Sequence, residues 1–385
     1  MLNFSFYSPT KFVFGKGEEN NIGQLLSQRG TKKVLLHYGG QSAEKSGLLG
    51  RVRTSLKGAG IEFVELGGVH PNPRYSLAVE GMELARKENV DLILAVGGGS
   101  VVDSAKCIAA GTLYDGDVWQ DLYIEKKPYT KVLPVACILT IAAAGSEGSA
   151  GSVISNREVG IKEGIRTNDL LRPVLSILNP ELTMTLPAYQ TACGVTDMFI
   201  HLTERYFTNT KDVDITDELT EGLMRTILKY GIVCVKEPDN YNARAQIMWA
   251  GTLAHNDLCG VGREQDWASH HIQHRIGAKY DSAHGAGLAT IFPAWAQYVY
   301  KHDVPRFVRF ATKVMGVDND VFHPEEVALE GIRRIKAYFA SLGMPTSLSE
   351  LGVKDEDIKE LANFNDGFFV KLTPADMEKI FDLAK

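Results

Sequence analysis

The stretch Leu92 to Asp103 reads LILAVGGGSVVD and joins a run of apolar residues to three glycines. An apolar run without polar alternation is typical of a buried strand in a parallel sheet. Because glycine has no side chain, Gly97, Gly98 and Gly99 let backbone amides approach a ligand closely. A helix starting at Ser100 would direct its free N–H groups and its dipole toward a pyrophosphate. The stretch therefore predicts a strand, a glycine turn and a helix that bind a dinucleotide.

Two other phosphate-binding patterns are absent from this stretch. The glycines do not lead into the Gly-Lys-Ser/Thr end of an ATP-binding loop. They also do not form a G-x-G-x-x-G pattern with an acidic residue about 20 positions further on. Taken alone, the stretch leaves a purely structural glycine turn open.

Apolar runs of similar length lie on both sides of this stretch and alternate with amphipathic helical patterns. Strands separated by helices predict βαβ units and a parallel sheet. The predicted strands are 33–38, 61–66, 92–96, 132–140 and 174–178. The predicted helices between them are 42–59 and 75–88.

The texture of the sequence changes near Asn179-Pro180-Glu181, where a proline follows the last apolar run. Helical periodicity dominates from there onward, with helices predicted over 190–207, 214–230 and 324–342. The sequence thus predicts an α/β dinucleotide-binding domain with a parallel sheet over residues 1–182. An all-helical metal-binding domain is predicted over residues 183–385, with the active site in the cleft between the two domains.

Composition and charge argue against several classes of function. The chain has 41 Lys and Arg against 47 Asp and Glu, for a formal net charge of -6. Because nucleic-acid binding requires clustered cations, this balance argues against a nucleic-acid partner. The longest apolar run, about Val132 to Ala144, is too short to span a membrane, and Met1 to Phe14 lacks the features of a signal peptide. We therefore expect a cytoplasmic protein without a membrane partner.

A second glycine-rich strand exit, Gly39-Gly40-Gln41-Ser42, bears on the choice of cofactor. No acidic residue stands directly at this exit, where one would bind the ribose 2′-OH of NAD. Small residues and the Ser42 hydroxyl would accommodate a 2′-phosphate, which favours NADP(H). Glu44 lies close enough to keep NAD(H) open.

The candidate metal ligands lie in the second half of the chain, where four of the ten histidines fall within fifteen consecutive residues. Asp197 and His201 are spaced i, i+4 in a helical stretch, so both project from one face. His270 and His274 have the same spacing, and His284 follows at a turn. One carboxylate with several imidazoles suits a first-row divalent ion such as Fe²⁺, Zn²⁺ or Ni²⁺.

A dinucleotide site combined with an open metal site points to hydride transfer. The metal would act as a Lewis acid on a carbonyl or alkoxide oxygen. The cofactor would carry out the redox step, while the protein orients it. The chain has no G-x-S-x-G segment, so acyl-enzyme hydrolysis has little support.

Five segments resemble those of the iron-containing alcohol dehydrogenases. They are 9–15 (PTKFVFG), 97–103 (GGGSVVD), 194–201 (GVTDMFIH), 255–263 (HNDLCGVGR) and 266–289 (DWASHHIQH through DSAHGAGLA). The resemblance covers essentially the whole chain and is greatest for the butanol dehydrogenase branch. It implies NAD(P)H-linked interconversion of primary alcohols and aldehydes, Fe²⁺ as the metal with Zn²⁺ or Ni²⁺ as alternatives, and a homodimer.

The resemblance also implies roles for individual residues. The four implied metal ligands are Asp197, His201, His270 and His284. His274 would lie near the substrate and the nicotinamide and take part in a proton relay. The implied cofactor contacts are Gly39, Gly40, Ser42, Gly97, Gly98, Gly99, Ser100, Asp103, Thr140, Ser149 and Lys162.

The chain departs from the family pattern at two places. Residues 142–144 are all alanine where Pro-Ala-Thr commonly precedes Gly-Ser-Glu, so a hydroxyl that would touch the cofactor is missing. Gln41 stands where a small residue is common. A polyol dehydrogenase or a dehydroquinate synthase-like enzyme of the same fold remains an alternative, although a phosphorylated substrate would need several Lys or Arg. A non-catalytic relative would bind the cofactor without turnover.

Overall fold

The computed structural model describes residues 1–385 and divides into two compact units. One unit comprises Tyr7–Thr185, and the other comprises Leu186–Lys385 together with Met1–Phe6. These first six residues fall within the range 1–182 that the sequence assigns to the α/β domain. They nevertheless cluster with the helical unit, where the Leu2 amide donates to the Gly262 carbonyl over 2.8 Å.

The α/β unit is built on a six-stranded, wholly parallel sheet with the strand order β1-β8-β5-β4-β2-β3. Its strands are β1 (Lys11–Phe14), β2 (Lys33–Tyr38), β3 (Glu62–Leu66), β4 (Leu92–Gly97), β5 (Val135–Leu139) and β8 (Leu175–Leu178). A separate antiparallel hairpin consists of β6 (Val153–Asn156) and β7 (Ile161–Gly164). The predicted fold class, a parallel α/β domain followed by helices, is confirmed.

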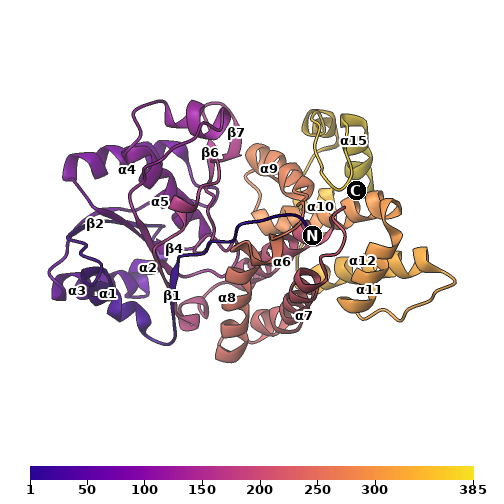
Figure 1. Ribbon diagram of the computed structural model, residues 1–385, viewed down its shortest axis with the longest axis horizontal. Helices are drawn as coiled ribbons and strands as arrows, with labels where there is room; N and C mark the ends of the chain where they lie inside the picture. Colours follow the sequence, from indigo (N-terminus) through magenta and orange to yellow (C-terminus); the bar gives the residue numbers. More distant parts are fainter. The chain divides into compact units, whose positions relative to one another are not determined.

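Helices cover both faces of this sheet (Figure 1). They are α1 (Ile22–Ser27), α2 (Ser42–Lys45), α3 (Leu48–Gly58), α4 (Tyr75–Glu88) and α5 (Gly99–Thr112). Leu35 and Ile93 pack in the core under α4 and α5, whereas Leu36 and Leu94 pack in the core with α1 and α3. Alternate side chains of one strand thus enter different cores, which explains why the strands are continuously apolar.

Some local predictions differ from the structure. The helix predicted over 42–59 is interrupted between α2 and α3, where Gly47 has a φ of 73° in the left-handed region. The sequence does not predict strand β1 or the β6–β7 hairpin, because none of these strands is fully buried, unlike the equally short β8. The other predicted strands and the helix over 75–88 are confirmed.

The second unit is helical. Its helices are α6 (Ala188–Tyr206), α7 (Asp214–Lys236), α8 (Tyr241–His255), α9 (Ala268–Tyr280), α10 (His284–Val299), α11 (Val304–Lys313), α12 (Pro324–Ser341), α13 (Leu348–Leu351), α14 (Ile358–Leu361) and α15 (Pro374–Leu383). Helix α6 packs against α7, α8 and α10, and α10 packs against α9. Both α6 and α10 are buried along most of their length. None of the helices combines the length and the apolar character needed to cross a membrane.

Candidate metal centre and nucleotide loop

One face of α6 carries the first part of the candidate metal centre. Asp197 and His201 lie one helical turn apart, as their spacing predicts. Each side chain belongs to a residue that is only 4% exposed. The Asp197 carboxylate oxygen Oδ1 lies 3.7 Å from Nδ1 of His201. A buried carboxylate and a buried imidazole are therefore already adjacent within a single helix.

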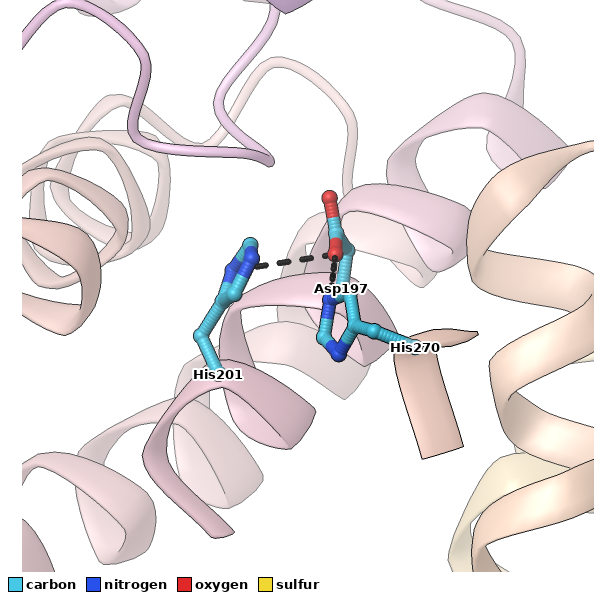
Figure 2. Close-up of side chains that lie close together, drawn as sticks. All are labelled: Asp197, His201 and His270. Atoms are coloured by element: carbon cyan, nitrogen blue, oxygen red, sulfur yellow. Dashed lines mark ion pairs between the residues drawn. The ribbon is translucent and has the colours of Figure 1, made fainter. Parts of the chain in front are cut away.

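Two further imidazoles reach the same carboxylate oxygen from neighbouring helices. His270 of α9 places Nε2 3.6 Å from Asp197 Oδ1, and His284 at the start of α10 places Nε2 3.5 Å from it. Figure 2 shows the Asp197 carboxylate facing the imidazoles of His201 and His270. The structure thus brings together all four residues that the sequence assigns as metal ligands.

These distances fit a shared cation better than direct hydrogen bonds. A hydrogen bond would bring a nitrogen to about 2.7–3.2 Å from its acceptor. Ligand atoms at metal bond lengths of about 2.0–2.1 Å in a tetrahedron lie about 3.4 Å apart. Asp197 Oδ1, His201 Nδ1 and His270 Nε2 are buried and have no hydrogen-bond partner. Because buried polar atoms are normally paired, their convergence fits a divalent ion.

The electrostatics of the centre agree with this assignment. Burial lowers the pKa of His201 well below its usual value, and the nearby imidazoles of His255 and His270 lower it further. Burial also disfavours charge on His270, but the carboxylates of Glu204 and Asp197 raise its pKa to about 9. The carboxylates therefore favour a positive charge at this place in the fold, as a metal ion would supply.

The position of His284 depends on a close approach between two helices. Gly285 follows His284 in α10, and a Cβ atom there would lie 2.1 Å from the backbone carbonyl oxygen of Cys193 in α6. Such a contact is impossible, so the absence of a side chain at Gly285 lets His284 approach Asp197. A glycine thus contributes to the metal centre without touching the metal.

We expect the Gly285→Ala variant to bind Zn²⁺ about 5- to 150-fold more weakly than the wild type. Overpacking of this kind costs about 1–3 kcal/mol, and the helix start must move to relieve it. The measurement is the dissociation constant for Zn²⁺ by chelator competition. Gly222→Ala on α7 is the matched control, because only the end of the Arg225 side chain lies within 4 Å of its added Cβ. Equal affinities in both variants would contradict the assignment of Gly285.

His274 lies beside the metal centre. It is one turn beyond His270 on α9, and its ring centroid is 6.3 Å from that of His270 and 5.6 Å from that of His284. Its side chain is partly exposed, unlike those of the buried ligands. Its predicted role in a proton relay stays a prediction.

The predicted glycine turn forms the junction between β4 and α5. Gly97 ends the strand, Gly98 is the N-cap of the helix and Gly99 is its first residue, one position before the predicted start. A Cβ atom would lie 2.4 Å from Val101 at Gly97 and 2.9 Å from Ile141 at Gly98. No side chain caps this helix end. Packing within the chain thus requires glycine at both positions, and the uncapped N-terminus of α5 has the backbone amides and the dipole that suit a pyrophosphate.

Several predicted cofactor residues have partners within the α/β unit. Asp103 accepts hydrogen bonds from the Ser146 hydroxyl at 2.5 Å and from the Val153 amide at 3.0 Å. Lys162 donates to the Asn72 side chain at 2.9 Å.

Other predicted cofactor residues lie at strand and helix ends. Thr140 follows β5, and its amide donates to the Gly97 carbonyl at 2.9 Å. Ser42 opens α2, directly after Gly39, Gly40 and Gln41, and Ser100 lies in the first turn of α5. The contacts of these residues with a cofactor stay predictions.

Sequence reasoning missed a buried lysine beside the glycine turn. Lys106 of α5 has no exposed surface, and its Nζ donates to the carbonyl oxygens of Ser146, Ser149 and Gly151 at 2.7–2.9 Å. It also lies within hydrogen-bond distance of the two serine hydroxyls. The sequence shows only one lysine in a largely apolar helix, and nothing in it identifies the carbonyl groups that this lysine binds.

Comparison with known proteins agrees with this geometry. Residues 9–180 match the family model for iron-containing alcohol dehydrogenase. Residues 191–381 match the model for the C-terminal part of the Fe-containing alcohol dehydrogenase family. Together the two matches cover nearly the whole chain.

Individual relatives are similar over more than nine tenths of their length. The chain is 40% identical to NADH-dependent butanol dehydrogenase A of Clostridium acetobutylicum, over 100% of this chain and 99% of that protein. It is 37% identical to the NADPH-dependent aldehyde reductase YqhD of Escherichia coli, over 94% and 92% of the two chains. The crystal structure of an NADH-dependent butanol dehydrogenase A from Thermotoga maritima superposes with a TM-score of 0.96 at 41% identity, covering 100% and 99%.

Proposed function

The chain belongs to the iron-containing alcohol dehydrogenase family, and we propose that it interconverts primary alcohols and aldehydes in the manner of a butanol dehydrogenase. It is an NAD(P)H-linked alcohol/aldehyde oxidoreductase. The observation that carries the proposal is the placement of three imidazole nitrogens within 3.5–3.7 Å of one carboxylate oxygen. The polyol dehydrogenase and dehydroquinate synthase-like alternatives are not favoured, because the similar relatives named above act on butanol or aldehydes.

The residues of the chain have separable tasks in this reaction. A bound metal ion would supply Lewis acidity toward the substrate oxygen. Asp197, His201, His270 and His284 would hold that ion. The free amides at the start of α5 would hold the pyrophosphate and so orient the nicotinamide. His274 would accept or return the proton of the alcohol, since it lies beside the ligands and is partly exposed.

The finer assignments follow the same residues. We propose Fe²⁺ as the native metal, with Zn²⁺ or Ni²⁺ as substitutes that the same ligands accept. We propose NADP(H) as the favoured cofactor with NAD(H) as a second one, because no acid lies among Gly39, Gly40 and Ser42. Glu44 does not oppose NADP(H) directly, since its carboxylate is paired with Arg53. Asp103, Thr140, Ser149 and Lys162 would line the cofactor site.

We further propose that the protein works as a cytoplasmic homodimer. Several large apolar side chains at the N-terminus are strongly exposed, including Met1 and Leu2 at 49% and Phe4 at 53%. Exposed apolar side chains gathered in one segment are typical of an association surface. Light scattering of the purified protein measures the number of subunits directly.

An assay with butanal tests the proposed function. Protein purified without chelator is expected to contain about one divalent ion per chain by elemental analysis. It should then oxidise NADPH faster than NADH when butanal is supplied, and lose this activity on chelation. Restored turnover with Fe²⁺ would confirm the metal dependence. A folded, metal-loaded protein without turnover of butanal would refute the proposed substrate, and faster oxidation of NADH would reverse the cofactor preference.

A further inference from the structure

The carboxylate of Glu204 lies on the same face of α6 as the two ligands Asp197 and His201. Glu204 follows Asp197 by seven residues and His201 by three, so all three side chains project from one stripe of the helix. Glu204 is only 3% exposed. Because a carboxylate is rarely buried without a partner, this burial calls for a group that contacts it. Its partner is the third ligand, His270.

The two carboxylate oxygens of Glu204 contact two different groups of His270. Oε1 accepts a hydrogen bond from the His270 backbone amide at 3.0 Å, and Oε2 lies 2.9 Å from the ring nitrogen Nδ1. His270 is the third residue of α9, so its amide is one that the helix leaves without an internal partner. One carboxylate thus both holds the start of α9 and faces the imidazole.

The contact determines which ring nitrogen carries the proton. A neutral imidazole has one N–H donor and one lone pair, and a carboxylate can only accept. When neutral His270 holds a metal ion through the lone pair of Nε2, its proton must lie on Nδ1, which is the nitrogen 2.9 Å from Glu204 Oε2. In the opposite tautomer, a lone pair would face Glu204 and destabilise the site. Metal binding requires the first arrangement.

We propose that Glu204 is a positioning residue that keeps His270 in the metal-binding tautomer and orientation. The inference rests on the proposed function, since it assumes that His270 is a ligand. Carboxylates that orient ligand imidazoles typically contribute 10–100-fold to metal affinity. His284 has an equivalent partner in Gln273, whose side-chain oxygen contacts His284 Nδ1. The buried ligand His270 thus contacts a carboxylate, whereas the partly exposed ligand His284 contacts a neutral amide.

The test uses Co²⁺ as a spectroscopic probe in the full-length protein. Glu204→Gln keeps the shape of the side chain but leaves a single acceptor oxygen for two N–H groups. We expect Co²⁺ to bind 10–100-fold more weakly to this variant by chelator competition, with an altered visible absorption spectrum. Glu204→Asp, which keeps the charge, should recover part of the affinity.

Glu221→Gln is the matched control. Glu221 is a fully buried carboxylate on α7 that accepts hydrogen bonds from Tyr206 and Arg309. This variant should lose thermal stability and keep the wild-type Co²⁺ affinity and spectrum.

The outcomes separate this inference from the proposed function. A Glu204→Gln variant with wild-type Co²⁺ affinity and spectrum would overturn the positioning role, even if its metal-free stability falls. If Glu204→Gln does not fold, the Glu204→Asp variant decides by the same two measurements. A wild-type protein that fails to bind Co²⁺ would instead refute the metal centre and the proposed function with it.

Discussion

Replacing His270 by alanine is expected to abolish butanal turnover and to leave the purified protein without bound metal. His270 supplies one of the four atoms that converge on the metal position, 3.6 Å from Asp197 Oδ1. Because loss of a residue that merely orients a ligand costs about 10–100-fold in metal affinity, loss of a ligand should cost more than about 100-fold. Elemental analysis after dialysis and the rate of NADPH oxidation measure the two effects.

A control separates loss of the metal from loss of the fold. His323→Ala removes a histidine whose side chain is 62% exposed and pairs with Asp320 on the surface. It should keep both metal and activity. In the His270→Ala variant, binding of NADPH by the α/β unit should persist, since that unit has its own core. Full activity of His270→Ala would refute the metal assignment.

The α/β fold could be predicted because each buried strand is apolar on both sides. Leu35 and Leu36 are neighbours in β2 yet enter separate cores, so the whole strand reads as one hydrophobic run. The four-residue strand β1 gives no such signal, and its partner β8 lies more than 150 residues further along the chain. Short edge strands are stabilised by pairing with a distant segment, which a local pattern does not contain.

Spacing could predict the pair Asp197 and His201 because a helix fixes which residues share a face, whereas the choice of His270 and His284 as the other two ligands rests on the family resemblance. Asp197 and His201, one turn apart, needed no knowledge of the tertiary fold. Glu204 lies on that same face, but its partner His270 is 66 residues away. Nothing in the sequence distinguishes Glu204 from an ordinary surface glutamate in an amphipathic helix. The contact between Glu204 of α6 and His270 of α9 depends on the tertiary fold, which no local sequence pattern contains.

The nucleotide loop shows a second limit of sequence reasoning. The three glycines predict a close approach of backbone to ligand, which stays a prediction, whereas the structure explains Gly97 and Gly98 by packing, because an added Cβ would meet the side chains of Val101 and Ile141. Asp103 and Ser149 were assigned to the cofactor only through family resemblance. In the structure Asp103 accepts hydrogen bonds from Ser146 and Val153, which stabilise the loop. Its contact with a cofactor stays a prediction.

The Lys106→Met variant is expected to destabilise the α/β unit by about 3–5 kcal/mol, the usual cost of removing one partner from a buried charged group and its acceptors. Lys106 has no exposed surface, and its three N–H groups match the carbonyl oxygens of Ser146, Ser149 and Gly151. Methionine fills a similar volume but leaves these acceptors buried without donors. Burial lowers the pKa of Lys106 to about 8, although the Asp103 carboxylate opposes this shift. The desolvation of the ammonium therefore offsets part of the stability that its hydrogen bonds contribute.

Urea unfolding of the wild type and the variant measures this loss, and hydrogen exchange locates it. Exchange should accelerate most in residues 145–156, which contain the three carbonyl groups bound by Lys106 and strand β6. The affinity for NADPH should fall as well. Ala144 of the same loop lies beside Gly99, so a loosened loop would disturb the predicted pyrophosphate site at the start of α5. Lys87→Met on α4 is the control, since Lys87 is exposed and its replacement should change stability by less than about 0.5 kcal/mol. Equal stability of the Lys106 and Lys87 variants would mean that desolvation of the ammonium cancels its five contacts, and that the loop keeps its shape without the cage.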